Sequence, residues 1–214
     1  VLMYSCEEFG TAFIQRLKND FFHPIQPIFK RNFIMKDSSN VFIDEILEDF
    51  KVLSSLGSAM TPDIIYIDQM NKILIRNKIE EDKHSRIVDV AEKLQGLVKM
   101  IKIPLVIAHQ ANRASAKRDG FLTEEHMADA DAVYREATMV ITVESPHYTE
   151  WNNVKKDMLR EFEYFINVAK NRDANGWKGA ARCTFDRSTG IFFEEEEREQ
   201  YCLSFADWVA KRKK

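Results

Sequence analysis

The alternation of short apolar runs with amphipathic segments of helical length is the feature that most constrains the fold of this chain. Apolar runs of strand length occur at residues 1–5, 32–35, 64–67 and 105–108. Because these runs lack regular polar alternation, they predict strands buried within a parallel sheet. Parallel neighbours need crossover connections, so helices are expected between these strands and on both faces of the sheet.

Apolar residues at helical spacing supply those crossovers. The pattern occurs over 9–17, 43–53 and 85–100, and each of these segments lies between two of the apolar runs. The polar residues at 37–40 are good helix caps, and we expect them to begin the second helix. The sequence therefore predicts an α/β fold with a mostly parallel, twisted sheet.

The second half of the chain has a different pattern. Further apolar runs occur at 139–143, 165–169, 181–185 and 191–193. Apart from a candidate helix near 151–162, no regular helical pattern separates them, which favours an antiparallel extension of the sheet. We expect one domain over 1–195, followed by a C-terminal acidic/amphipathic helix over 196–214 with a basic tip.

Composition limits the class of protein. With 45% hydrophobic residues among 214, the chain has enough apolar side chains for a well-buried core. The formal net charge of -3 excludes a generally basic nucleic-acid coat, so any nucleic-acid contact must come from a local patch. Cys6, Cys183 and Cys202 are scattered without a CxxC pair, which indicates reduced thiols in a cytosol-like compartment. No apolar run approaches the roughly 20 residues that cross a bilayer, so no membrane partner is expected.

Polar side chains follow several of the predicted strands at the point where each strand ends. These are Glu7 after the first run, Asp68 after the third, Gln110 after the fourth, and Lys170 and Arg172 after the run at 165–169. Ligands of open parallel sheets bind at the carboxyl ends of the strands, so these side chains are expected to converge. Two acids, an amide and two cations suit phosphoryl transfer, in which an acid holds magnesium, another polarises water and cations neutralise phosphate charge.

In this order and at these spacings, the residues resemble the RecA-like motor domain of DnaB-like hexameric replicative helicases. The strand at 1–5 with its following helix is similar to the family strand whose terminal glutamate activates the attacking water. Glu7 matches that glutamate, and Glu8 is the alternative. The segment 63–68 resembles the family's Walker B strand, which implies that Asp68 holds Mg²⁺ through water. The resemblance covers roughly residues 1–195.

Two later elements are the most specific parts of this resemblance. The Gln-x-Asn-Arg element at 110–113 is similar to the strand end whose glutamine senses the terminal phosphate, which implies that role for Gln110. The Lys-x-Arg element resembles the family's closing hairpin. There the lysine and arginine, matched here by Lys170 and Arg172, reach across a subunit interface to the neighbour's nucleotide.

The resemblance implies an ATP-dependent DNA helicase that uses ATP and Mg²⁺, forms a homo-oligomer (a hexameric ring) and unwinds DNA during replication. Arg113, Lys117 and Arg118 lie in the loop after Gln110, which would face the channel of such a ring, where cations can contact the phosphates of single-stranded DNA. Primase or a helicase loader is the further partner implied. The implied localisation is cytoplasmic, in a bacterium or from a phage or plasmid.

The chain departs from the family in its phosphate-binding segment. No Walker A motif (GxxxxGK followed by Ser or Thr) occurs, and in the family this motif lies just before the strand at 1–5. We therefore expect a fragment that is inactive alone, with a natural remnant as the alternative. The segment 128–131, Ala-Asp-Ala-Asp, has no basic residue and no glycine where the family has an arginine–glutamate–small–glycine stretch, which favours a divergent member. A RecA-type recombinase or signalling ATPase, and a nucleotide-free interaction module, are the alternative functions.

Overall fold

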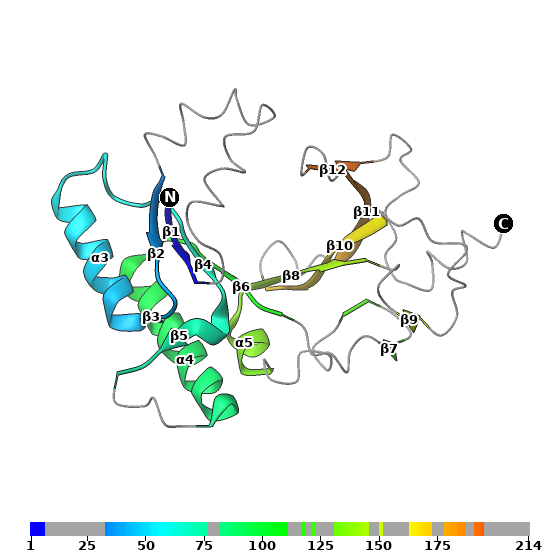
Figure 1. Ribbon diagram of the computed structural model, residues 1–214, viewed down its shortest axis with the longest axis horizontal. Coiled ribbons are helices and arrows are strands. Elements are labelled where there is room, and N and C mark those ends of the chain that lie inside the picture. Colours follow the sequence, from blue (N-terminus) through cyan, green and yellow to red (C-terminus); the bar gives the residue numbers. More distant parts are fainter. Residues whose placement is uncertain are drawn as a thin grey trace. The chain divides into compact units, whose positions relative to one another are not determined.

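The computed structural model describes residues 1–6, 33–76, 82–110, 117–118, 121–122, 131–145, 150–151, 163–172, 178–186 and 191–194. The chain divides into two compact units, Val1–Gln110 and Ala111–Lys214. Figure 1 shows the helices and strands of both units.

A parallel sheet forms the centre of the first unit. Its strands are β1 (Leu2–Ser5), β2 (Ile34–Asp37), β4 (Ile65–Asp68) and β6 (Leu105–Ala108), in the order β2-β1-β4-β6. Every neighbouring pair is parallel. The structure therefore confirms the parallel sheet predicted from the four apolar runs. The order is not the sequence order, because β1 lies between β2 and β4.

Two long helices accompany this sheet, α3 (Ile43–Ser55) and α4 (Lys83–Ile101), which pack side by side (Figure 1). The apolar stripe predicted for α4 is buried, with Ile87 and Val90 each only 1% exposed. Ile46 of α3 is fully buried. Both crossover helices thus lie where the helical spacing predicted them, while the helix expected at 9–17 lies outside the described residues.

The start of α3 differs from the prediction. Residues 37–40 do not cap this helix, because the two-residue strand β3 (Val41–Phe42) intervenes and pairs in parallel with β5 (Ile73–Leu74). Phe42 occupies the N-cap position instead, and its backbone N–H donates to the Glu45 carboxylate over 3.3 Å. A pairing between segments about thirty residues apart therefore decides where this helix begins.

The second unit contains an antiparallel sheet, as predicted. Its strands are β8 (Met139–Glu144), β10 (Glu163–Asn171), β11 (Gly179–Asp186) and β12 (Ile191–Glu194), in the order β12-β11-β10-β8. A short helix, α5 (Asp131–Glu136), precedes β8. Residues 152–162 of the candidate helix and the C-terminal helix over 196–214 lie outside the described residues, while Trp151 belongs to the short strand β9 (Glu150–Trp151).

Some short elements had no clear sequence signal. They are η2 (Met70–Lys72), the β3–β5 pair, and the parallel pair of β7 (Lys117–Arg118) with β9 (Glu150–Trp151). Two-residue strands carry too few side chains to show a periodicity. In the described part of the chain, no helix combines the length and apolar character needed to span a membrane.

The predicted burial of β6 is wrong in part. Val106 is 42% exposed, and the other residues of the strand are only partly buried. Among the described strands β6 pairs only with β4, so it lies at the end of the sheet. Apolar composition marks a residue as strand-forming, but position in the sheet decides how far the strand is covered.

Candidate functional site

The carboxyl edge of the parallel sheet brings together the ends of β1, β4 and β6. Ser5 pairs with Asp68, and Asp68 pairs with Ala108 on its other side. The backbone N–H of Cys6 donates to the Asp68 carbonyl over 2.8 Å. Asp68 therefore lies between the end of β1 and the end of β6, and Gln110 follows two residues after Ala108. The register thus places Asp68 and Gln110 at the same edge, as the sequence predicted.

Asp68 is half-buried, and the residues directly before and after it in the chain are buried or half-buried. Burial, with a smaller contribution from the Asp68 charge, raises the pKa of the neighbouring Tyr66 hydroxyl. Asp68 is followed by Gln69, whose side chain is only 3% exposed. The side-chain oxygens of Gln69 and Asn71 have no hydrogen-bond partner within the described residues. Buried acceptors of this kind call for a water, an ion or a ligand.

These side-chain oxygens suit a magnesium ion better than a metal that is enclosed entirely by protein ligands. Mg²⁺ keeps several of its waters and is usually held by one or two carboxylates, with oxygen ligands throughout. Asp68 offers such a carboxylate, and the next residue in the chain, Gln69, offers a buried carboxamide oxygen. Among the described residues, no three His, Cys, Asp or Glu side chains gather as a metal-binding group. The sequence marks Gln69 as a polar residue at the strand end, but its pattern gave no reason to assign it a role.

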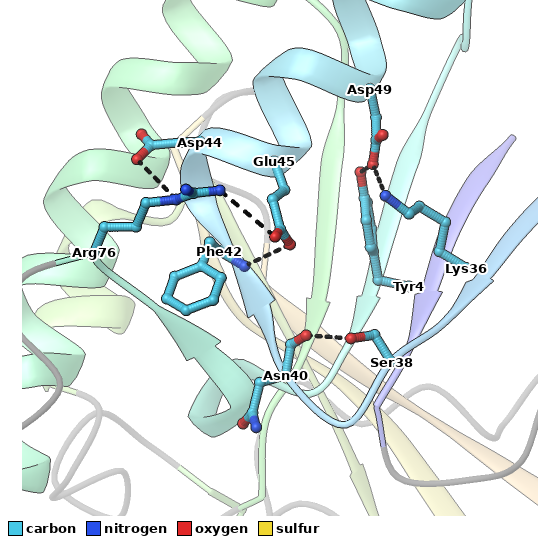
Figure 2. A network of polar contacts seen from close by, with 9 residues as sticks. All are labelled: Tyr4, Lys36, Ser38, Asn40, Phe42, Asp44, Glu45, Asp49 and Arg76. Carbon is cyan, nitrogen blue, oxygen red and sulfur yellow. Dashed lines mark hydrogen bonds and ion pairs between the residues drawn. The ribbon is translucent and has the colours of Figure 1, made fainter.

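A polar network fixes β1 behind this edge (Figure 2). The Tyr4 hydroxyl donates to Asp49 Oδ2 over 2.6 Å, and Lys36 Nζ donates to the same oxygen over 2.7 Å. Tyr4 is fully buried, and this burial, together with the hydrogen bond to Asp49, raises the pKa of its hydroxyl. The contacts join β1, β2 and α3, so they hold the strand whose end leads to residue 7.

A second cluster of predicted site residues lies at the end of β10. Lys170 Nζ donates to the Tyr134 carbonyl and, over 2.9 Å, to the Arg135 carbonyl. Arg172 Nη2 also donates to the Arg135 carbonyl. The structure therefore brings the two predicted cations together, at the C-terminal turn of α5, where helix carbonyls attract positive charge.

A buried carboxylate in the second unit was not predicted. Glu144, 3% exposed, accepts hydrogen bonds from the Thr142 hydroxyl (2.6 Å) and from the backbone N–H of Leu122 (3.0 Å). The Asn167 amide donates to the Thr142 hydroxyl over 3.3 Å. The contact with Leu122 anchors the chain just beyond the predicted DNA-binding loop. A lone glutamate in an apolar run gives no sign of such a partner in the sequence.

The remaining predicted residues are less fully described. Glu7 and Arg113 lie outside the described residues, as does Glu8. Lys117 and Arg118 form β7, of which the backbone is described and the side chains are not. The described candidate residues therefore form two groups, each within one unit: Asp68 and Gln110 at the sheet edge of the first unit, and the pair of cations in the second.

Comparison with known proteins relates this arrangement to one family. The profile of the family described as DnaB-like helicase C-terminal domain matches residues 9–194. A solved ATPase domain superposes with a TM-score of 0.75 at 15% identity, covering 91% of this chain and 74% of that one. A DnaB-like replicative helicase, solved in a study that includes its interactions with primase, gives the same TM-score and identity.

This second likeness covers 91% of the present chain and 51% of the helicase, so the chain spans about half the length of that protein. At this level of identity the structural matches establish the RecA-like fold. A search of curated proteins gives no match.

Proposed function

The chain belongs to the family of DnaB-like helicase C-terminal domains, and from this we propose that it is the ATP-driven motor of a replicative helicase that works as a ring on DNA. The observation that supports the proposal is the parallel register of β1, β4 and β6, in which Asp68 pairs with Ser5 and with Ala108, two residues before Gln110. In α/β sheets of this kind, ligands bind outside the carboxyl ends of the strands. ATP would supply the phosphoryl group, and Mg²⁺ with the side chains at this edge would neutralise the charge on its phosphates.

Within this proposal the residues of the first unit divide the work. Asp68 would hold the magnesium ion through water, and the buried side-chain oxygen of Gln69 would accept a hydrogen bond from a water of that ion. Gln110 is exposed beyond β6, where its amide can reach the terminal phosphate. Glu7 takes a proton from the attacking water as general base. Tyr4, Asp49 and Lys36 keep β1 in place for this role.

Lys170 and Arg172 neutralise charge on the nucleotide of the neighbouring subunit. Guanidinium groups suit this task, because they keep their charge and can contact two oxygens of one phosphate at once. Arg113, Lys117 and Arg118 contact the phosphates of single-stranded DNA in the channel. Primase or a helicase loader is the further protein partner that we propose for the assembled ring.

The full-length protein that carries this chain provides the test. We expect ATP hydrolysis that requires Mg²⁺ and rises with single-stranded DNA, together with unwinding of a forked duplex. Asp68→Asn should reduce hydrolysis on the order of 10²-fold or more, the scale of a lost charge-stabilising group. The matched control is Asp63→Asn, because Asp63 is an exposed aspartate just before the same strand.

The outcomes separate the alternatives. Hydrolysis with DNA stimulation but no strand separation would support a recombinase or signalling ATPase. Absence of nucleotide binding in the full-length protein would support an interaction module and overturn the proposal. Equal losses in Asp68→Asn and Asp63→Asn would show that the metal site is misplaced.

Mixed rings test the division of roles between subunits. Arg172→Ala and Glu7→Gln subunits are each expected to retain only a small residual activity alone. Mixed together they form some interfaces with an intact base on one side and an intact arginine on the other, so part of the activity should return. Native mass spectrometry confirms that mixed rings are present. A confirmed mixture as inactive as its parents would place Arg172 in the same subunit as the nucleotide it serves.

A further inference from the structure

The last turn of α5 receives two cations, Lys170 of β10 and Arg172 directly after that strand. The helix closes with a hydrogen bond from the Ala137 N–H to the Val133 carbonyl over 2.9 Å. The carbonyls of Tyr134 and Arg135 come next, and the final carbonyls of a helix have no partner within the helix itself. Lys170 and Arg172 occupy these acceptors. The end of β10 is thereby attached to the end of α5.

Tyr134 contacts the end of β10 through its hydroxyl, its ring and its backbone carbonyl. Its hydroxyl donates to the Ala169 carbonyl over 3.1 Å, one residue before Lys170. Its ring centroid lies 4.9 Å from the Lys170 ammonium, within cation–π range. Its own carbonyl accepts from the same ammonium. The tyrosine is 8% exposed, so these contacts are largely shielded from water.

The backbone completes the attachment. The Arg172 N–H donates to the Thr138 carbonyl over 2.9 Å, in the two-residue connection between α5 and β8. β8 in turn pairs with β10, so helix, connection and strand form one closed unit. The main chain on both sides of Lys170 is therefore tied to α5 or to the residues that follow it.

The two cations differ in how many of their hydrogen-bond donors remain available for a ligand. An ammonium has three donors, and Lys170 directs its donors to two carbonyls while facing the Tyr134 ring. A guanidinium has five donors, and Arg172 contacts the Arg135 carbonyl through Nη2 with its side chain exposed. Arg172 can therefore keep its helix contact and still present donors to a phosphate.

We propose that Tyr134 is a positioning residue for Arg172: through Ala169 and Lys170 it fixes the end of β10 against α5, and so sets where the guanidinium projects. This inference rests on the proposed role of Arg172 at the neighbour's nucleotide. It adds a residue outside the Lys-x-Arg element to the machinery. Misplacement of a charge-stabilising group by about 1 Å can cost on the order of 10²-fold in rate, so such anchoring matters for turnover.

The test uses assembled full-length rings and three tyrosine variants. Tyr134→Phe removes the bond to Ala169 and keeps the ring, and should lower kcat about fivefold, the effect of one net hydrogen bond. Tyr134→Leu also removes the ring and should lower kcat on the order of tenfold or more. KM for ATP should stay unchanged, because the lost interaction acts on charge that develops in the transition state. Tyr164→Phe, on the same strand β10, is the matched control and should behave as wild type.

A double-variant cycle distinguishes positioning from general support of the fold. In an Arg172→Ala background, Tyr134→Phe should cause no further loss, because the group it positions is already gone. A residue that merely supports the fold would lower activity by the same factor in both backgrounds. Melting temperature and ring assembly are measured for every variant, and Tyr134→Phe decides the question if Tyr134→Leu does not fold.

The results separate this inference from the function it rests on. If Arg172→Ala rings hydrolyse ATP as fast as wild type, the proposed role of Arg172 fails. If Arg172→Ala is impaired while Tyr134→Phe retains wild-type kcat, or if the two losses multiply, the positioning role of Tyr134 is overturned and the role of Arg172 stands.

Discussion

At the scale of single residues, the Tyr4 hydroxyl shows how a buried polar group is paired. Tyr4 is fully buried, and its hydroxyl finds an acceptor in Asp49, which also accepts from Lys36 (Figure 2). The Lys36 and Asp49 side chains are 43% and 26% exposed, so water screens the ion pair between them. The hydrogen bond from Tyr4 is the more valuable contact, because a buried donor left without a partner loses its full solvation.

Removal of the acceptor should therefore cost more than removal of the donor. Asp49→Ala leaves the Tyr4 hydroxyl unpaired and is expected to lower the free energy of unfolding by about 1–3 kcal/mol. Tyr4→Phe removes the hydroxyl itself and should cost about 1 kcal/mol. Urea unfolding measures both. Glu48→Ala, at an exposed position of the same helix, is the control and should change stability by less than about 0.5 kcal/mol. A smaller loss for Asp49→Ala than for Tyr4→Phe would contradict this reasoning.

Asp82 predicts a dependence of stability on pH. Its carboxylate caps α4, accepting from the backbone N–H groups of His84 (2.9 Å) and Ser85 (3.1 Å). Hydrogen bonds, with that from the Ser85 hydroxyl first, hold its pKa below the ordinary value of 3.8. Because the folded pKa is the lower one, the stabilisation is present above pH 3.8 and is lost as the pH falls through the folded pKa.

Cap variants measure this contribution. Asp82→Ala should lower the melting temperature at neutral pH, and its difference from wild type should shrink in acid, where the wild-type carboxylate is protonated. Asp82→Asn is the matched variant, since asparagine caps helices about as well and does not titrate. Thermal unfolding followed by circular dichroism, measured from neutral pH down into acid, gives both comparisons. If the difference in melting temperature between wild type and Asp82→Ala stays constant into acid, the charge of Asp82 has no part in the cap.

At the scale of elements, the end of α4 carries a local conflict between sequence and conformation. Lys102 adopts φ 58, the left-handed region, and its N–H donates to the Val98 carbonyl over 2.8 Å. Helices often end on such a residue, and glycine is the usual choice because it has no Cβ to clash. A lysine at this position keeps the helix end at the cost of backbone strain.

Replacement of this lysine should relieve the strain. Lys102→Gly is expected to raise the free energy of unfolding by about 1 kcal/mol, as the left-handed penalty disappears. Lys93→Gly, within the same helix and also exposed, should do the opposite and lower it by about 1 kcal/mol. Chemical denaturation of the two variants beside wild type is sufficient. Loss of stability in both variants would show that the left-handed turn is not strained.

At the scale of the whole molecule, the proposed function depends on a ring and on a local basic patch. The net charge of -3 gives no general attraction to DNA. Binding to single strands must therefore come from few cations placed along the phosphate backbone. Arg113, Lys117 and Arg118 are the candidates, within the loop that Glu144 anchors at Leu122.

Salt dependence tests that patch directly. Each phosphate neutralised on a single strand contributes about -0.7 to the slope of log K against log salt. Replacing Arg113, Lys117 and Arg118 by alanine should flatten the slope by up to about 2 and weaken binding without changing sequence preference. Replacing Lys51, Lys93 and Lys99, which are exposed on α3 and α4, removes equal charge and should leave the slope unchanged. Nucleotide-bound rings are titrated at several salt concentrations, and equal slopes for the two triple variants would place the DNA contacts elsewhere.

The sequence alone determined the parallel core and the edge at which its chemistry gathers. The runs that became β1, β2, β4 and β6 were recognisable as short continuous apolar stretches between segments of helical spacing, and this local pattern needs no knowledge of partners. Once four parallel strands are recognised, their carboxyl ends must share an edge, so the positions of Asp68 and Gln110 follow from local pattern. Their chemical roles, like that of Glu7, stay predictions.

Only the tertiary structure decided which side chains are buried and which partners they contact. Residues 139–143 are mostly apolar, yet Ile141 and Val143 are each 55% exposed while Thr142 and Glu144 are buried. Thr142 is buried because Asn167 and Glu144 pair with it, and these contacts follow from the pairing of β8 with β10. Likewise, Lys170 and Arg172 could be identified as cations at a strand end, but not as partners of the α5 carbonyls. Hydrogen bonds between residues far apart in sequence depend on how the elements meet, which no local periodicity encodes.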